Sequence, residues 1–219
     1  MHIYYKMSSS WKSDCCDELR KFRFTKHERK LIFGDDKKHC DDKKNDSECD
    51  LRVDFRELWG IHAIYTKFFI ISVLASIPDA DLLAARLLRN QDEIGDFVGR
   101  FVGEGRGNRL AQLLREHILA AAGAITAVKG GNQQEIDAAV QKVFENSREV
   151  SAFISSLNPK KLPFRVVLDH FNEHNQFVID MTVARKNNDF AKDIELFDLY
   201  YAQILRFSDL ILNGIISCH

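Results

Sequence analysis

The sequence predicts an all-α fold, a compact six-helix bundle made of three helical hairpins that follow a charged N-terminal extension. Apolar residues recur at helical spacing from Leu51 onward. The chain has only three prolines, and all of them fall between the periodic segments. A histidine followed 28 or 29 residues later by a side-chain carboxamide occurs three times, as His62 with Asn90, His117 with Asn146 and His174 with Gln203.

The histidine and carboxamide unit has a turn near its middle in each copy. These turns are Pro78-Asp79, Gly130-Gly131-Asn132 and Asn187-Asn188-Asp189. Each unit is therefore expected to be a helix, a turn and a helix, and short turns make consecutive helices antiparallel. Three such hairpins form a compact six-helix bundle, and a three-unit solenoid is the alternative architecture.

The first predicted hairpin has helices over residues 58–73 and 82–101, where apolar positions form one stripe. Asp79 or Asp81 is available to cap the second of these helices. Glycines then interrupt the pattern at Gly103, Gly105 and Gly107, so we expect the second helix to be broken there.

The second predicted hairpin covers residues 110–127 and 136–157. Gly130 and Gly131 stop its first helix, and Asn132 with Glu135 has the spacing of a capping box. The third hairpin covers residues 164–181 and 194–211. Its first helix is preceded by a connection that Pro159 and Pro163 bracket.

Composition and charge exclude several classes of protein. The chain has 31 basic and 32 acidic residues and a net charge of -1, so no strong nucleic-acid signal is present. The amino terminus lacks a secretion signal, and five cysteines are an odd number, which favours an intracellular protein with reduced thiols. Residues 61–77 carry His62, Thr66 and Lys67 and are too few for a membrane span, so a buried helix is expected there.

Residues 1–50 differ from the helical-bundle domain over residues 51–219. They contain the charged run DDKKHCDDKKNDSECD, which is typical of a solvated extension. A zinc site is the alternative interpretation of the cysteines and histidine in this extension, which are Cys15, Cys16, His39, Cys40 and Cys49. Their spacing includes no C-x2-C pair, so incidental cysteines in a charged tail are preferred.

A polar pocket is the sharpest chemical hypothesis. An approximate threefold relation between the hairpins brings His62, His117 and His174 to similar depth, with Asn90, Asn146 and Gln203 facing them from the even-numbered helices. Nearby carboxylates that complete the candidate set or orient the imidazoles are Asp92, Glu116 and Glu173. Three imidazoles and a water suit zinc, and added carboxylates extend the choice to iron or manganese. The preferred interpretation is a polar layer whose members satisfy one another.

Two further features are candidates for a chemical role that is independent of the histidines. The segment GRFVGEGRGN at residues 99–108 places glycines and arginines before a helix, so Arg106 and Arg109 are candidate phosphate contacts. It lacks the lysine and hydroxyl order of a P-loop, which favours a helix-breaking loop instead. Cys218 is a candidate reactive thiol if it is exposed.

Several segments resemble an uncharacterised bacterial helical-bundle family, with related proteins in giant viruses of the marseillevirus group. These segments are LWGIHAIYTKFFIIS, ARLLRNQDEIGDF, LLREHILAA and the Asn158-Pro159 turn, and the resemblance spans residues 55–216. It implies an all-helical fold, and no catalytic residues can be carried over from it. The added extension makes a virion-associated or packaging protein the expectation for a viral member.

Two hypotheses of function follow. The first is a nonenzymatic structural or interaction protein that uses the bundle as a scaffold and the extension as a partner-binding arm, with a protein partner or a homodimer expected. The second is a metal-binding protein or metal-dependent enzyme centred on the three histidines. The first is preferred because the sequence contains no strong catalytic motif.

Overall fold

The structure is a computed structural model that describes residues 44–216, with side chains from residue 49 onward. The chain divides into two compact units, Met1–Leu51 and Arg52–His219, and the bundle described below belongs to the second. The zinc interpretation of Cys15, Cys16, His39 and Cys40 and the proposed reactivity of Cys218 concern positions outside the described residues.

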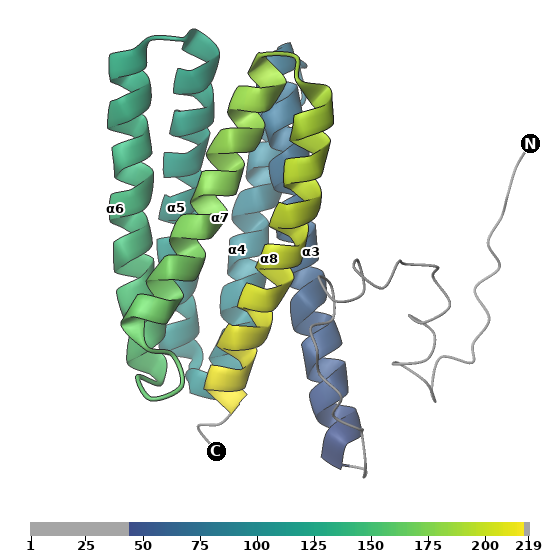
Figure 1. The fold of residues 1–219 in the computed structure, drawn as a ribbon. Coiled ribbons are helices and arrows are strands. Elements are labelled where there is room, and N and C mark those ends of the chain that lie inside the picture. The colour runs from purple at the N-terminus through teal and green to yellow at the C-terminus, as the bar shows by residue number, and fades with distance from the viewer. Residues whose placement is uncertain (1–43, 217–219) are drawn as a thin grey trace, which may run out of the picture. The chain divides into compact units, whose positions relative to one another are not determined.

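Six helices and no strand make up the described part of the chain, which confirms the predicted all-α class. The helices lie side by side as a bundle, as Figure 1 shows. In chain order they are α3 (Lys44–Ala75), α4 (Ala80–Val102), α5 (Glu104–Gly130), α6 (Gln133–Leu157), α7 (Phe164–Lys186) and α8 (Phe190–Ile216). The first of them begins inside the segment that the sequence predicts to be an extension.

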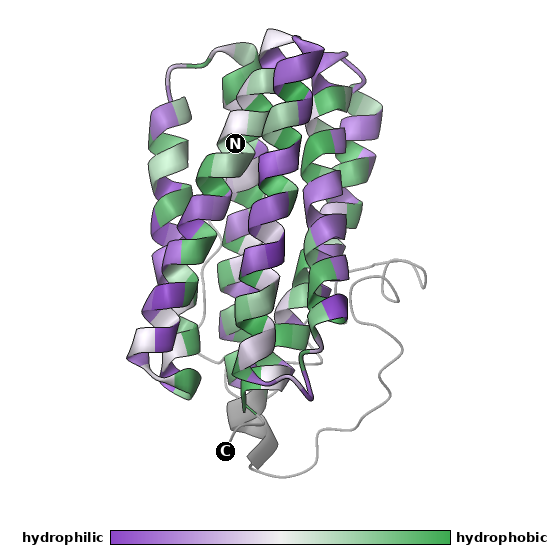
Figure 2. Ribbon diagram, turned by 90° about the vertical axis from the view of Figure 1, so that its left-hand side faces the viewer, coloured by the Kyte–Doolittle hydropathy of each residue, from purple (hydrophilic) through white to green (hydrophobic). Residues whose placement is uncertain are grey.

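The three hairpins turn where the sequence predicts. The connections are residues 76–79 between α3 and α4, 131–132 between α5 and α6, and 187–189 between α7 and α8. Gly131 has φ 84° and Asn188 has φ 60°, a left-handed conformation that these two residue types adopt at the lowest cost. Hydrophilic and hydrophobic residues alternate along each helix in Figure 2, as expected for amphipathic helices around a shared core.

The first and last helices of the bundle pack against each other. The rings of Trp59 on α3 and Phe207 on α8 lie 5.7 Å apart, and Arg56 forms an ion pair with Asp209. One turn before Trp59 on the same side of α3, Phe55 stacks on Phe97 of α4 at 4.7 Å. Because a solenoid leaves its end units apart, this contact shows that the hairpins form a closed compact bundle.

The connection between α4 and α5 differs from the predicted loop. Only Gly103, with φ 94°, separates the two helices, and Gly105 and Gly107 lie inside α5. A Cβ atom on Gly107 would lie 2.5 Å from the carbonyl oxygen of Gly95 and 2.7 Å from the Cα atom of Gly99. These glycines therefore permit a close crossing of α4 and α5 and do not form a long loop.

The two predicted caps have different outcomes. The side chain of Asn132 accepts hydrogen bonds from the backbone amides of Gln134 at 3.0 Å and Glu135 at 3.3 Å, so the predicted cap of α6 is confirmed. Asp79 precedes α4 but makes no side-chain cap. Its carboxylate instead accepts a hydrogen bond from Ser72 at the end of α3. Asp79 therefore stabilises the turn between α3 and α4 and does not cap α4.

One helix combines length with high hydropathy. Within α3, the stretch Cys49–Ala75 is long and apolar enough to cross a membrane by length and composition, and half of its most apolar 18-residue window is buried inside the protein. A core helix of a bundle meets the same criteria, so these two properties alone do not assign it to a membrane.

Candidate functional site

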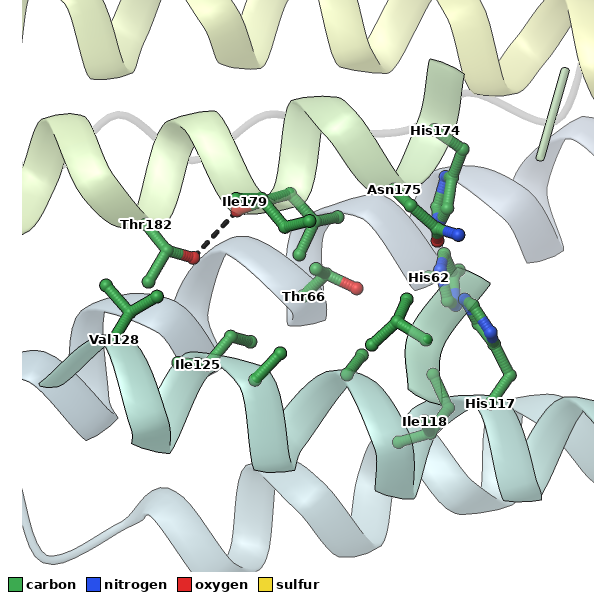
Figure 3. A pocket seen from close by; sticks show the side chains of 14 residues that line it. His62, Thr66, His117, Ile118, Ile125, Val128, His174, Asn175, Ile179 and Thr182 are labelled. Carbon is green, nitrogen blue, oxygen red and sulfur yellow. Dashed lines mark hydrogen bonds between the residues drawn. The ribbon is translucent and has the colours of Figure 1, made fainter. Parts of the chain in front are cut away.

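The three repeated histidines lie together in the interior of the bundle. His62 comes from α3, His117 from α5 and His174 from α7, and their exposed fractions are 3%, 3% and 5%. The ring centres of His62 and His174 are 5.6 Å apart, and those of His117 and His174 are 6.0 Å apart. Figure 3 shows the three imidazoles gathered at one end of a pocket. We call these residues the histidine layer.

The carboxamides of the first and third units make equivalent hydrogen bonds. Asn90 donates to the carbonyl oxygen of Leu58 at 3.0 Å, and Gln203 donates to that of His170 at 2.9 Å. Each acceptor lies four residues before the histidine of its unit, which is one helical turn away. Both amides therefore bind the backbone beside the histidine layer.

The second unit uses its carboxamide differently. The Oδ1 atom of Asn146 lies 2.9 Å from the Nδ1 atom of His117, so Nδ1 carries the proton and donates it to the amide oxygen. The neighbour of Asn146 also takes part, because Asn175 of α7 donates to the hydroxyl of Ser147. The second unit thus connects α5, α6 and α7 through side chains.

Sequence reasoning missed three polar residues around the layer. Gln91 lies with its Nε2 atom 3.2 Å from Nδ1 of His62, and Thr66 and Asn175 line the same pocket as the histidines. The sequence could have indicated two of these residues, because Gln91 follows the repeated Asn90 and Asn175 follows His174. Thr66 lies four residues after His62, on the same side of α3.

The histidine layer is electrically neutral at physiological pH. Burial, followed by the neighbouring His117, lowers the pKa of His62 to about 3 from its ordinary 6.5. Burial lowers the pKa of His117, although its hydrogen bonds with Asn146 and Asn175 act in the opposite direction. Burial also lowers the pKa of His174 well below its ordinary value, and the neighbouring His62 and His117 lower it further. Taking charged imidazoles out of water and placing them together is unfavourable, so each ring stays uncharged.

Tyr200 and Thr66 form a further polar pair beside the histidine layer. The ring of Tyr200 on α8 is 5.1 Å from that of His174, and burial raises the pKa of its hydroxyl, an effect that Thr66 partly offsets. Among the described residues, no protein atom completes a hydrogen bond with Tyr200 Oη, Thr66 Oγ1 or His174 Nδ1. They are three of the seven buried side-chain atoms of the described residues that lack a hydrogen-bond partner.

The pocket beside the layer is narrow and mostly apolar. Its volume is about 20 Å³, which is the space of roughly one water molecule. Apolar side chains form most of its walls beyond the histidines, and these include Ile118, Ile125, Val128, Val143 and Val178. The arrangement suits neutral hydrogen bonding in a confined space and leaves no room for an organic substrate.

The remaining candidates lie away from the layer. Asp92 pairs with Arg115 at 2.9 Å on the half-exposed surface, and Glu116 accepts a hydrogen bond from Gln112. Glu173 is exposed. The prediction that these three carboxylates support the imidazoles is therefore wrong, because helical rotation turns them outward. Across residues 49–216, no group of three or more His, Cys, Asp or Glu side chains has an arrangement that would hold a metal ion.

The candidate phosphate contacts do not converge on a site. Arg109 pairs with Glu149 of α6 at 3.0 Å, and Arg106 is exposed. The hollow next to the α4–α5 connection is lined by Asp96, Arg100 and Glu104 with neighbouring small residues, and neither candidate arginine lines it. The carboxylates of Asp96 and Glu104 at this hollow would repel an anion such as phosphate.

No model of a known protein family matches this chain, and no curated protein or solved structure matches it.

Proposed function

We propose that this protein is a nonenzymatic structural or interaction protein, with the bundle as scaffold and residues 1–50 as a partner-binding arm. The observation that carries the proposal is an apolar surface on α3 and α8. Ile64 and Phe68 of α3 are 39% and 50% exposed, and Phe190 and Ile194 of α8 are 49% and 60% exposed. Together with half-buried Ile61, Ile71, Phe197 and Tyr201, these residues form what we call the α3–α8 face.

The two halves of this face are adjacent. Lys67, between Ile64 and Phe68 in α3, is bonded to Asp193 of α8 and lies 5.6 Å from the ring centre of Phe197. A Cβ atom on Gly60 would lie 3.0 Å from the hydroxyl of Tyr201. Contiguous exposed apolar surface favours contact with another macromolecule, because its burial releases the water that it orders.

The α3–α8 face rests on a rigid base. Asp193 is fully buried and binds both Lys67 of α3 and Arg185 of α7, the latter at 3.0 Å. Three helices are thereby fixed in register directly beneath the apolar residues. A surface that is already held in place loses little conformational entropy when a partner binds it.

Comparing matched surface variants in cells tests this proposal. The Phe68→Ser, Ile194→Ser double variant removes apolar area from the face, and Leu119→Ser removes an equally exposed leucine, 61% exposed, from α5. We expect proximity labelling to recover fewer partners with the face variant, and with a chain lacking residues 1–43, than with the native chain or the Leu119→Ser control. Equal recovery by all four chains would contradict the proposal.

Metal content separates this proposal from the metalloprotein hypothesis. We expect elemental analysis of untagged protein, purified without chelators, to find no stoichiometric zinc, iron or manganese. Stoichiometric metal that is lost in a folded His62→Gln, His117→Gln, His174→Gln variant would overturn the nonenzymatic proposal. Detection of the protein in purified virions would test the virion-associated role, which rests on the resemblance over residues 55–216.

A further inference from the structure

We propose that the α3–α8 face binds a second copy of this chain and forms a twofold homodimer. This inference rests on the proposed function, because it names the partner of the same surface. It follows from the arrangement of the apolar residues on the face, from its charge and from its area.

The face consists of two straight apolar stripes. On α3, Ile61, Ile64, Phe68 and Ile71 are three or four residues apart, and on α8 the same spacing relates Phe190, Ile194, Phe197 and Tyr201. Residues at this spacing lie along one side of a helix. Because α3 and α8 are antiparallel neighbours, the two stripes lie side by side, and a twofold axis can place the pair against the same pair of a second copy.

The charge of the face fits an uncharged partner. Lys67 and Arg185, the cations beside its residues, both pair with Asp193 beneath it. Arg185 also lies 5.3 Å from the ring centre of Phe190. Glu57 and Asp198 are the exposed charges on the same sides of α3 and α8, and both are acidic. A membrane-surface helix carries lysine and arginine beside its apolar side, so anionic lipid is disfavoured here. A second copy presents the same apolar residues, and the cations of each copy stay paired with their own Asp193.

The area is sufficient for a stable dimer. From their exposed fractions, the residues of the face offer on the order of 500 Å² of apolar surface per copy. A standard interface buries about 800 Å² per partner, of which a little over half is apolar. One copy of the α3–α8 face therefore supplies the apolar share of a standard interface.

Sedimentation of the full chain across a concentration series tests the dimer. We expect the native chain and the Leu119→Ser control to be dimeric at about 10 µM. We expect the Phe68→Ser, Ile194→Ser variant to show a dissociation constant at least tenfold higher, with unchanged helicity by circular dichroism. A monomeric native chain at this concentration, or a dimer that the face variant leaves intact, would overturn the inference.

Photo-crosslinking identifies the occupant directly. A benzophenone amino acid at position 68 is expected to give a chain-to-chain product whose peptides map to α3 and α8, whereas the same group at position 119 gives none. A product within one chain, a product with another protein or capture by lipid vesicles would each reject the second copy. If the chain is monomeric while the face variant still loses partners in cells, the homodimer fails and the proposed interaction function stands.

Discussion

The histidine layer and the α3–α8 face lie on opposite sides of the same helix. His62 and Thr66 of α3 are buried, whereas Ile64 and Phe68, two residues along from each, are exposed. The buried side of α3 is mostly apolar elsewhere, with Trp59 and Ile70 in the core, so these two pairs are a local exception to the usual amphipathic pattern. Polar groups inside need hydrogen-bond partners or neutrality, and apolar groups outside need another surface. The two regions therefore put different demands on the molecule, and each can be disturbed separately.

Acid is expected to disturb the layer most strongly. The three histidines have lowered pKa values in the folded state, so the unfolded chain binds more protons once the pH falls below its ordinary histidine pKa of 6.5. Stability is then complete above about pH 7 and is lost as the pH falls from 6.5 towards the folded values. Each histidine contributes up to about 1.4 kcal/mol per pH unit, or about 4 kcal/mol per unit for three.

Urea unfolding between about pH 7.5 and pH 5 measures this effect, because carboxylates titrate mainly below that range. A free energy of unfolding that stays constant over the range would show that the imidazoles are already protonated or are solvated. The α3–α8 face contains no histidine, so we expect face variants to keep the native pH dependence.

The buried charge beneath the face is expected to give the next largest effect. Asp193→Ala leaves Lys67 and Arg185 without their buried partner, and we expect it to lower the free energy of unfolding by about 3–5 kcal/mol. Lys192→Ala, which removes a surface ion pair with Glu195, is the matched control and should cost less than about 1 kcal/mol. Denaturant unfolding measures both variants. Similar losses of unfolding free energy would mean that Asp193 does not act as a buried partner for Lys67 and Arg185.

Within the layer, the second and third units are expected to differ. Asn146→Leu strands the Nδ1 atom of His117 and should cost about 1–3 kcal/mol at pH 8. His174→Leu should cost less than about 1.5 kcal/mol, since no described protein atom bonds to its Nδ1. It should also reduce the acid dependence by about one quarter to one third, because burial lowers the pKa of His170 as well as those of the layer. Equal losses in the two variants would show that His174 has a bonding partner comparable to that of His117.

The face variants are expected to have the smallest effect on folding. Phe68→Ser in dilute protein should lower the free energy of unfolding by about 1 kcal/mol, because half of the side chain is already in water and only the other half, which contacts Tyr65, loses burial. Thermal unfolding over a range of protein concentrations checks this, and only the native chain should gain stability as its concentration rises. A large loss in the dilute variant would place Phe68 in the core.

Local sequence signals predicted the hairpins well because turns depend on neighbouring residues. Gly131 and Asn188 adopt positive φ at the predicted positions, a preference that belongs to the residue itself. The segment 99–108 was harder, because Gly107 serves a contact with Gly95 and Gly99 on another helix. Glycines that break a helix and glycines that let two helices touch have the same local pattern.

The repeat predicted the depth of the histidines but not all of their partners. A helix turns about 100° per residue, so Asn90 and its neighbour Gln91 point to different sides of α4. One binds the backbone of α3, and the other binds the ring of His62. The exposed apolar side of α3 was not predicted, because the apolar residues of this stretch favour a helix that is buried all round.

The contact between α3 and α8 has a consequence for how the chain is made. Lys67 and Asp193 are 126 residues apart in sequence, and Arg56 and Asp209 are 153 apart. The ribosome releases the first of these helices long before the last. Until α8 emerges, the polar residues on the interior side of α3 lack their partners from α8. Early hairpins can form during synthesis, but the histidine layer gains its complete set of neighbours only after the carboxyl-terminal helix has emerged. Interrupted translation would therefore yield a chain whose core is exposed to solvent and prone to aggregate. Chaperones and proteases would bind such a chain.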